Sequence, residues 1–271
     1  MADLRVMSFN VRGARFLDGE NAWERRAELN VETIRRCTPD LIGFQELELD
    51  HLMTYQQHLP EYEYWLGLKT SSNKPPYEYV AIFWKAEHLV LLNAGGFWLN
   101  EVPHTFAPGW DAACTRVANW ARLRIVDTGR EFLFLNTHLD HVGEEARVNG
   151  TQLILQRLSE LRINELPMIV SGDFNCHPGS PAYKLFMEHG FVDTYLTTGN
   201  RDGETSNTFH AFGRLNVKTV KQKGEILRID WILLRDLVGR IGPKSSEIVR
   251  DARPPIYPSD HYPILTEFVE A

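Results

Sequence analysis

The chain has 271 residues, of which 43% are hydrophobic and 24% are charged, and this composition is typical of a globular protein. Its formal net charge of −7 and its pI of about 5.8 exclude the broad positive field that drives nonspecific nucleic-acid binding, although a local basic groove stays open. No apolar run approaches the roughly 20 residues that cross a bilayer, so we expect no stable membrane association.

The start of the chain and its cysteines indicate where the protein is expected to work. Residues 1–3 lead directly into a strand-like pattern without the basic and apolar regions of a signal peptide, which predicts a cytoplasmic protein. Cys37, Cys114 and Cys176 show no CxxC spacing, so a reducing compartment without a disulfide framework is expected. No repeat, low-complexity block or Ser/Gly linker divides the chain, and we expect one domain over residues 1–271.

In chain order, short apolar runs with strand character alternate with helical patterns in the first part of the sequence. Leu4–Asn10 is predicted to be a strand, and residues 22–37 a helix that Asn21 could cap. A second buried strand, Leu41–Gln45, ends just before Glu46. The next predicted elements are a helix over 48–59 and three neighbouring antiparallel strands over 62–68, 79–85 and 88–93.

The second half of the chain continues the same alternation. A hairpin is predicted over 117–127 and 132–137, followed by a long helix over Glu144–Glu160. Residues 193–223 are polar and partly rich in glycine, which predicts a long surface loop near the functional site. The remaining predicted elements are a strand over 168–171, a helix over 180–189 and strands over 227–234 and 262–268. Many strands with few helices predict an α/β fold in which two sheets pack together with helices outside.

Several predicted strands end in residue types that bind metals or transfer protons. Each of these residues alone could be an ordinary turn or cap residue. Their shared position at the ends of apolar strands indicates one catalytic site distributed along the chain, and their carboxylate and carboxamide oxygens suit a hard cation such as Mg²⁺ or Mn²⁺. The residues at these strand ends are Asn10, Glu46, His138, Asp173, Asn175, Asp260 and His261.

Three further polar residues lie in or beside predicted strands. Asp230 interrupts the apolar run 226–234, and a buried carboxylate needs a partner such as a histidine imidazole, whose ring it would orient and make more basic. Glu78 precedes a strand and is a possible carboxylate partner for His138. Arg116 could bind a phosphate oxygen through its planar guanidinium, or it could be a surface arginine.

In chain order, these ten residues strongly resemble the set found in the endonuclease/exonuclease/phosphatase superfamily, and the resemblance covers nearly the whole chain. The stretches 21–26, 97–111, 136–147 and 207–212 are most similar to a compact bacterial branch of that superfamily. The resemblance implies a DNase I-like fold, which is a four-layer α/β sandwich of two packed, mainly antiparallel sheets flanked by helices.

The resemblance also implies a role for each metal-binding residue. Glu46 would be the principal ligand of Mg²⁺ or Mn²⁺, with Asn10 beside it and Asp260 near a possible second metal position. Asp173 and Asn175 would flank the phosphate, and Asp173 would orient or deprotonate the attacking water or handle the proton of the leaving group.

The remaining residues would act on the phosphate and on protons. His261, paired with Asp230, would be a general base or would stabilise the transition state. His138, supported by Glu78, would contact a phosphate oxygen, and Arg116 would be a further anion clamp. No residue is an obvious covalent nucleophile, so direct attack by water is expected.

The expected function is therefore divalent-metal-dependent hydrolysis of phosphodiesters, with a nucleotide, a nucleic acid or a small phosphodiester as the substrate. A phosphomonoesterase or a phospholipid or inositol-phosphate hydrolase would use the same residues, and a noncatalytic binding module is the alternative outside enzymes. Aromatic residues that could stack on a base or pack in the core are Trp98, Phe106 and Trp110. A basic cluster that could face a polyanion, or be an ordinary solvated loop, comprises Lys218, Lys221, Lys223 and Arg228.

Overall fold

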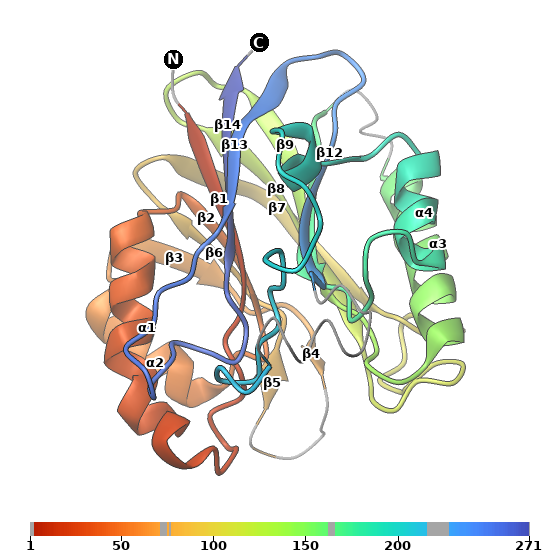
Figure 1. Cartoon of the computed structure of the whole chain (residues 1–271). Helices are drawn as coiled ribbons and strands as arrows, with labels where there is room; N and C mark the ends of the chain where they lie inside the picture. Colours follow the sequence, from red (N-terminus) through yellow and green to blue (C-terminus); the bar gives the residue numbers. More distant parts are fainter. Residues whose placement is uncertain (1–2, 71–74, 76, 162–165, 216–227, 271) are drawn as a thin grey trace.

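The computed structural model describes residues 3–70, 75, 77–161, 166–215 and 228–270, and two six-stranded β-sheets pack face to face in it (Figure 1). The first sheet consists, in spatial order, of β13 (Ile241–Ile248), β14 (Ile264–Glu270), β1 (Leu4–Asn10), β2 (Leu41–Gln45), β6 (Ile82–Lys85) and β3 (Tyr62–Trp65). The second consists of β11 (Val192–Asp193), β12 (Asp230–Arg235), β10 (Met168–Asp173), β9 (Glu131–His138), β8 (Val117–Ile125) and β7 (Leu89–Trp98).

Helices cover the outer faces of both sheets, which gives the four layers expected (Figure 1). The helices α1 (Trp23–Cys37) and α2 (Leu49–His58) pack on the first sheet, and α3 (Glu144–Glu160) and α4 (Pro181–Glu188) pack on the second. The smaller elements are the 3₁₀ turn η1 (Gly19–Asn21), the short helix α5 (Thr194–Thr197) and the two-stranded sheet of β4 (Lys69–Thr70) and β5 (Glu78–Tyr79). None of the described helices is both long and apolar enough to cross a membrane.

Strand pairing is mostly antiparallel, but two central pairs are parallel. β1 pairs with β2 so that Asn10 lies beside Gln45, and β9 pairs with β10 so that His138 lies beside Asp173. Because parallel neighbours end at the same edge of a sheet, each pair delivers two polar strand ends to one place. Residues from both sheets share one inter-sheet core, which supports our proposal that residues 1–271 form a single domain.

A buried polar layer lies between the inter-sheet core and these strand ends. The Asn136 carboxamide accepts hydrogen bonds from Gln45 Nε2 at 2.7 Å and from Ser171 Oγ at 3.2 Å, and it donates to the carbonyls of Phe44 and Ala81 at 2.9 Å each. The two sheets approach so closely here that a Cβ at Gly43 would lie 2.5 Å from Ser171 Oγ. This bridge fixes the separation of the sheets directly below the polar strand ends.

Two parts of the expected topology were wrong. The strand expected over 88–93 is part of β7, which pairs with β8 in the second sheet and is no neighbour of β6. Alternation of apolar residues predicts which face of a strand is buried, but it does not identify the partner strand. The strand β13 was not predicted, because it is a largely polar edge strand that is irregular between Pro243 and Ser245 and lacks a clear strand pattern.

Candidate active site

The predicted polar strand ends meet at one end of the sandwich, around a cavity of about 400 Å³. Period-two alternation explains this placement, because the face of β1 that carries Val6 in the inter-sheet core continues to Asn10. Strand register then sets Asp173 opposite His138 on one side and opposite Asp230 on the other. The cavity is lined by Arg12, Arg15, Phe16, Glu46, Glu78, Cys114, Arg116, His138, His141, Asp173, Asn175, Phe209, Asp260 and His261.

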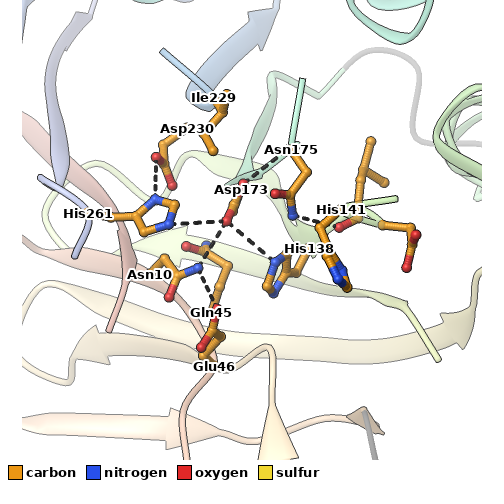
Figure 2. A network of polar contacts seen from close by, with 12 residues as sticks. Asn10, Gln45, Glu46, His138, His141, Asp173, Asn175, Ile229, Asp230 and His261 are labelled. Carbon is orange, nitrogen blue, oxygen red and sulfur yellow. Dashed lines mark hydrogen bonds and ion pairs between the residues drawn. The ribbon is translucent and has the colours of Figure 1, made fainter. Parts of the chain in front are cut away.

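Asp173 lies at the centre of the polar network (Figure 2). Its carboxylate accepts hydrogen bonds from Asn10 Nδ2 and from the Asn175 backbone N–H, each at 2.9 Å, and it lies 3.4 Å from His138 Nε2 and 3.8 Å from His261 Nε2. Burial, together with the nearby charge of Asp230, raises the pKa of Asp173 to about 7. A carboxylate with that pKa can take up and release a proton near neutral pH.

His261 is held by the carboxylate of Asp230, whose Oδ2 lies 2.9 Å from the ring Nδ1. Burial opposes a positive charge on the ring, but the carboxylates of Asp230 and Asp173 overcome it and raise the pKa of His261 to about 10. The ring is therefore an imidazolium at neutral pH, oriented with Nε2 toward Asp173 (Figure 2). His261 is therefore the histidine partner that was predicted for the buried Asp230.

The three residues predicted to bind the metal also come together. Glu46, which has a positive φ of 58° at the end of β2, accepts hydrogen bonds from Asn10 Nδ2 and from the Gly13 N–H, each at 3.0 Å. Burial alone would raise the pKa of Glu46, but these two donors and the His261 charge lower it. Burial raises the pKa of Asp260; the charge of His261 opposes this rise, and the nearby charge of Glu46 adds to it.

The buried carboxyl of Asp260 ionises less readily beside the charge of Glu46, and a cation bound between the two would relieve this. The all-oxygen set of Asn10, Glu46 and Asp260 fits Mg²⁺ or Mn²⁺ on this ground. A second group with metal-ligand chemistry comprises Asp173, Asp230 and His261, whose donor atoms lie within 4.8 Å of one another. Since His261 Nδ1 already binds Asp230 and the ring carries a positive charge, this second group suits proton handling better than metal binding.

His138 faces the cavity, but its expected partner lies elsewhere. Burial and the charge of Arg116 lower the pKa of His138 well below its usual value, so the ring is neutral. The expected support from Glu78 was wrong, because the described partners of that carboxylate are Arg15 Nη2 at 2.9 Å and Thr70 Oγ1 at 2.8 Å. Glu78 belongs to the small β4–β5 sheet rather than to the sheet edge beside β9, and its side chain meets the loop that follows β1.

Arg116 and Asn175 both lie at the cavity, as predicted. Arg116 is 6% exposed, and its guanidinium lies 3.4 Å from Asp140 Oδ2 and 3.0 Å from His141 Nδ1. The reading of Arg116 as a surface arginine is therefore excluded. Asn175 has a positive φ of 50° and donates its carboxamide N–H to the Leu139 carbonyl at 3.0 Å, which fixes the side chain at the cavity wall.

Several cavity residues that come from loops were not predicted from the sequence. Arg12, Arg15 and Phe16 follow Asn10 within six positions, and their place after a functional strand end was the available signal. Phe209 enters from the segment before β12 and packs on the His261 ring at 5.0 Å between centroids. No local pattern distinguishes that phenylalanine from a core residue.

The predicted basic cluster and the aromatic candidates do not line the cavity in the described part of the chain. Arg228 is fully buried and forms ion pairs with Asp193 and Asp202, so its assignment to an exposed cluster was wrong. The other members of that cluster, Lys218, Lys221 and Lys223, lie outside the described residues. Among the aromatic candidates, Trp98 packs edge-on against Phe106, and Trp110 packs on the core of the second sheet.

Comparison with known proteins identifies a family. A family model described as the Endonuclease/Exonuclease/phosphatase family matches residues 7–261. The chain is 32% identical to a solved endonuclease/exonuclease/phosphatase from Bacteroides vulgatus, with a TM-score of 0.88 and coverage of 100% of both chains. It is 30% identical to a mannosyl-6-phosphatase from Bacteroides thetaiotaomicron, with a TM-score of 0.83 and coverage of 98% of this chain and 99% of that one.

Two curated relatives are less similar to this chain, which covers a smaller share of their length. The chain is 25% identical to nocturnin from Xenopus laevis, over 97% of this chain and 72% of that protein. It is also 25% identical to a probable RNA exonuclease from Saccharomyces cerevisiae, over 70% of this chain but only 41% of that protein.

Proposed function

Because this chain belongs to the endonuclease/exonuclease/phosphatase family, we propose that it is a divalent-metal-dependent hydrolase of phosphoester bonds that works by direct attack of water. The observation that carries the proposal is the position of Asp173, a buried carboxylate bonded to Asn10 and flanked by His138 and His261. In-line phosphoryl hydrolysis needs an activated water and positive charge around the phosphate oxygens, and this arrangement offers both.

The metal site would be formed by Glu46, Asn10 and Asp260. A bound Mg²⁺ or Mn²⁺ would neutralise negative charge on the nonbridging phosphate oxygens and make the phosphorus easier to attack. Asn10 would have a second role. Its carboxamide donates to both Glu46 and Asp173, and it therefore sets the distance between Glu46 as metal ligand and Asp173 as proton acceptor. The same carboxamide accepts a hydrogen bond from the Arg12 N–H at 3.0 Å, which fixes its orientation.

The remaining residues would take the proton of the attacking water and bind the negative charge that increases on the phosphate. Asp173 would take a proton from the attacking water as the bond from water oxygen to phosphorus forms and the bond to the alcohol oxygen breaks, and the departing oxygen would take up a proton from solvent. His261 as imidazolium, neutral His138 and Arg116 would hold the phosphate oxygens on which negative charge increases. Asp230 would keep His261 both charged and oriented.

Two substrate classes are candidates, each supported by a comparison. A phosphodiester substrate is the class expected from the sequence, and similarity to a probable RNA exonuclease supports it. A phosphomonoester substrate is supported by the similarity to a mannosyl-6-phosphatase, which extends over nearly the full length of both chains.

The experiment is a hydrolysis assay on a diester panel and on p-nitrophenyl phosphate, with Mg²⁺, Mn²⁺ or EDTA. Activity should vanish with EDTA, return with either metal and be lost in His261→Ala and Asp173→Asn. Metal-independent activity, or full activity in both variants, would refute the assignment. Metal binding by calorimetry without turnover of any ester would instead favour a noncatalytic binding module.

A further inference from the structure

One part of the cavity wall is not explained by the chemistry of hydrolysis. Arg15 presents a side chain that is 32% exposed, while its guanidinium forms ion pairs with Glu48 and with Glu78, the latter at 2.9 Å. The Arg15 backbone N–H also donates to Glu48 Oε2 at 3.1 Å. Both carboxylates are largely buried, with exposed fractions of 1% for Glu48 and 4% for Glu78, and of the two only Glu78 lines the cavity. Arg15 is thus held in place from two sides at the edge of the cavity.

The charge of this group argues against an anion as its ligand. Two carboxylates on one guanidinium leave a net negative charge, so a second phosphate group would be repelled here. Arg15 still has N–H groups beyond those that bond Glu48 and Glu78, since a guanidinium has five. Among the described residues, the donors to the Glu78 carboxylate are Arg15 and Thr70, and these two bonds leave it further lone pairs. A donor and an acceptor side by side match a hydroxyl group, which both donates and accepts.

An aromatic ring completes the wall. Phe16 packs against two guanidinium groups, with the Cζ of Arg12 at 3.8 Å and that of Arg15 at 4.6 Å from the ring centroid. Gly13 permits this packing, because a Cβ there would lie 2.9 Å from the Phe16 ring and 2.8 Å from Glu48 Oε1. A fixed aromatic face beside charged donors and acceptors can cover the C–H face of a small ring whose hydroxyls are hydrogen-bonded.

The charges of the whole cavity lining point the same way. Four carboxylates line it, and three arginines face them. The carboxylates are Glu46, Glu78, Asp173 and Asp260, and the arginines are Arg12, Arg15 and Arg116. Each of these arginines already forms an ion pair, Arg12 with Asp18, Arg15 with Glu48 and Arg116 with Asp140, so the lining leaves little unpaired positive charge for a further phosphate.

We propose that Arg15, Glu78 and Phe16 form the subsite for the leaving alcohol, and that this alcohol is small, uncharged and rich in hydroxyl groups, as in a sugar or another polyol. Arg15 and Phe16 touch the alcohol, and Glu78 accepts one of its hydroxyls while it positions Arg15. The inference rests on the proposed function and selects the phosphomonoester of a polyol from its two substrate classes. The volume of about 400 Å³ suits a ligand of that size.

The test compares three substrates in Mg²⁺: a hexose 6-phosphate, p-nitrophenyl phosphate and a short single-stranded oligonucleotide. The variants are Arg15→Met and Glu78→Gln, with Arg36→Met as the matched control, since Arg36 is an arginine of α1 whose side chain is 56% exposed and paired with Asp251. In Arg15→Met, the ratio of kcat/KM for the hexose phosphate to that for p-nitrophenyl phosphate should fall about tenfold or more, chiefly through KM, because a site that hydrogen-bonds hydroxyls loses those bonds. Arg36→Met should leave the ratio unchanged.

Other outcomes separate failure of the subsite from failure of the proposed reaction. Equal losses on both monoesters in both variants, or a preference of the unmodified protein for the oligonucleotide, would overturn the subsite while leaving metal-dependent hydrolysis intact. Absence of metal-dependent turnover on all three esters would refute both. Thermal melting of each variant checks folding, and Glu78→Gln, which keeps the size of the side chain, decides the question if Arg15→Met does not fold.

Discussion

His261 and Asp230 form a hydrogen bond of 2.9 Å in which the ring Nδ1 donates to the carboxylate Oδ2. Asp230 lies opposite Asp173 in the β10–β12 ladder, so the same register that aligns the strands also places His261 Nε2 3.8 Å from the Asp173 carboxylate. The ring is thus held between two carboxylates within a buried site. Its positive charge at neutral pH follows from this arrangement and from no single neighbour.

The variant Asp230→Asn should lower the pKa of His261 and lower kcat. Asparagine can still accept the Nδ1 hydrogen bond, but it removes the negative charge that offsets the cost of burying the imidazolium. The expected loss is about 10²–10⁴-fold in kcat, the range for one acid–base group. Steady-state kinetics across pH 5–10 measures it, with Asp127→Asn in the exposed β8–β9 turn as the control. An Asp230→Asn enzyme with the kcat and pH profile of the unmodified protein would contradict the assignment.

The variant Glu46→Gln should abolish stabilisation by Mg²⁺. A ligand at 100 times its Kd stabilises a protein by about 2.7 kcal/mol, and for a chain of this size about 1 kcal/mol corresponds to roughly 2–4 °C in Tm. A Tm increase of about 5–10 °C is therefore expected for the unmodified protein under those conditions, and none for Glu46→Gln. The control is Glu87→Gln, whose side chain is 70% exposed. If both variants keep the full shift, Glu46 is not a metal ligand.

The strand ends could be predicted because their signal is local. A run such as Ile169–Ser171 alternates between the two cores, and the residue that continues its inter-sheet face beyond the apolar part is Asp173. The same reasoning holds for Asn10 after Val6 and for His138 after Phe134. Residue type and position in the alternation are both visible in the chain, so the identity and shared location of these side chains followed.

Side-chain partners could not be predicted in the same way, because they depend on how distant segments pack. Glu78 and His138 carry complementary chemistry, yet Arg15, 63 positions away from Glu78, is the partner that the fold supplies. Arg228 looked like part of a solvated loop, but Asp193 and Asp202 bind it in the interior. In both cases the deciding quantity is burial, and composition alone does not show whether a charged side chain is buried beside its counter-charge.

The stability of the fold should fall in acid partly because of His51. Its ring is fully buried, and Nδ1 accepts the Glu48 backbone N–H at 2.9 Å as part of the cap of α2. Burial, and after it the charge of Arg26, lower the pKa of His51 well below its usual value of 6.5. Protonation therefore favours the unfolded chain. The contribution of neutral His51 to the free energy of unfolding is complete above pH 6.5, and it is lost as the pH falls below 6.5, at about 1.4 kcal/mol per pH unit.

Urea unfolding at pH 7, 6 and 5 measures this slope. In His51→Gln, whose carboxamide oxygen can still accept the Glu48 N–H, the dependence on pH should be weaker by about one proton. The control is His58→Gln, at the exposed end of the same helix, and its slope should equal that of the unmodified protein. Equal slopes in all three proteins would show that His51 does not contribute to the loss of stability in acid.

Arg26 should be essential both for stability and for the metal site. Its side chain is fully buried and donates to the carbonyls of Asn21 at 2.9 Å, Val11 at 2.8 Å, Pro258 at 2.9 Å and Arg12 at 2.5 Å. No carboxylate in the described part of the chain forms an ion pair with it, and burial lowers its pKa to about 10. It therefore works as a connector between the loop that follows Asn10 and the loop that carries Asp260.

The variant Arg26→Met leaves those carbonyls without their donor and should cost about 3 kcal/mol or more, since each buried unpaired group costs about 1–3 kcal/mol. Arg26→Lys, with fewer donors in a different geometry, should recover only part of this loss. Because Asn10 and Asp260 would no longer be held at a fixed distance from each other, Mg²⁺ affinity should also fall. Calorimetry should rank the unmodified protein, Arg26→Lys and Arg26→Met in the same order as their stabilities. The matched control is Arg25→Met, on the exposed face of the same helix. A folded Arg26→Met protein that binds Mg²⁺ as tightly as Arg25→Met would show that the two loops keep their positions without this connection.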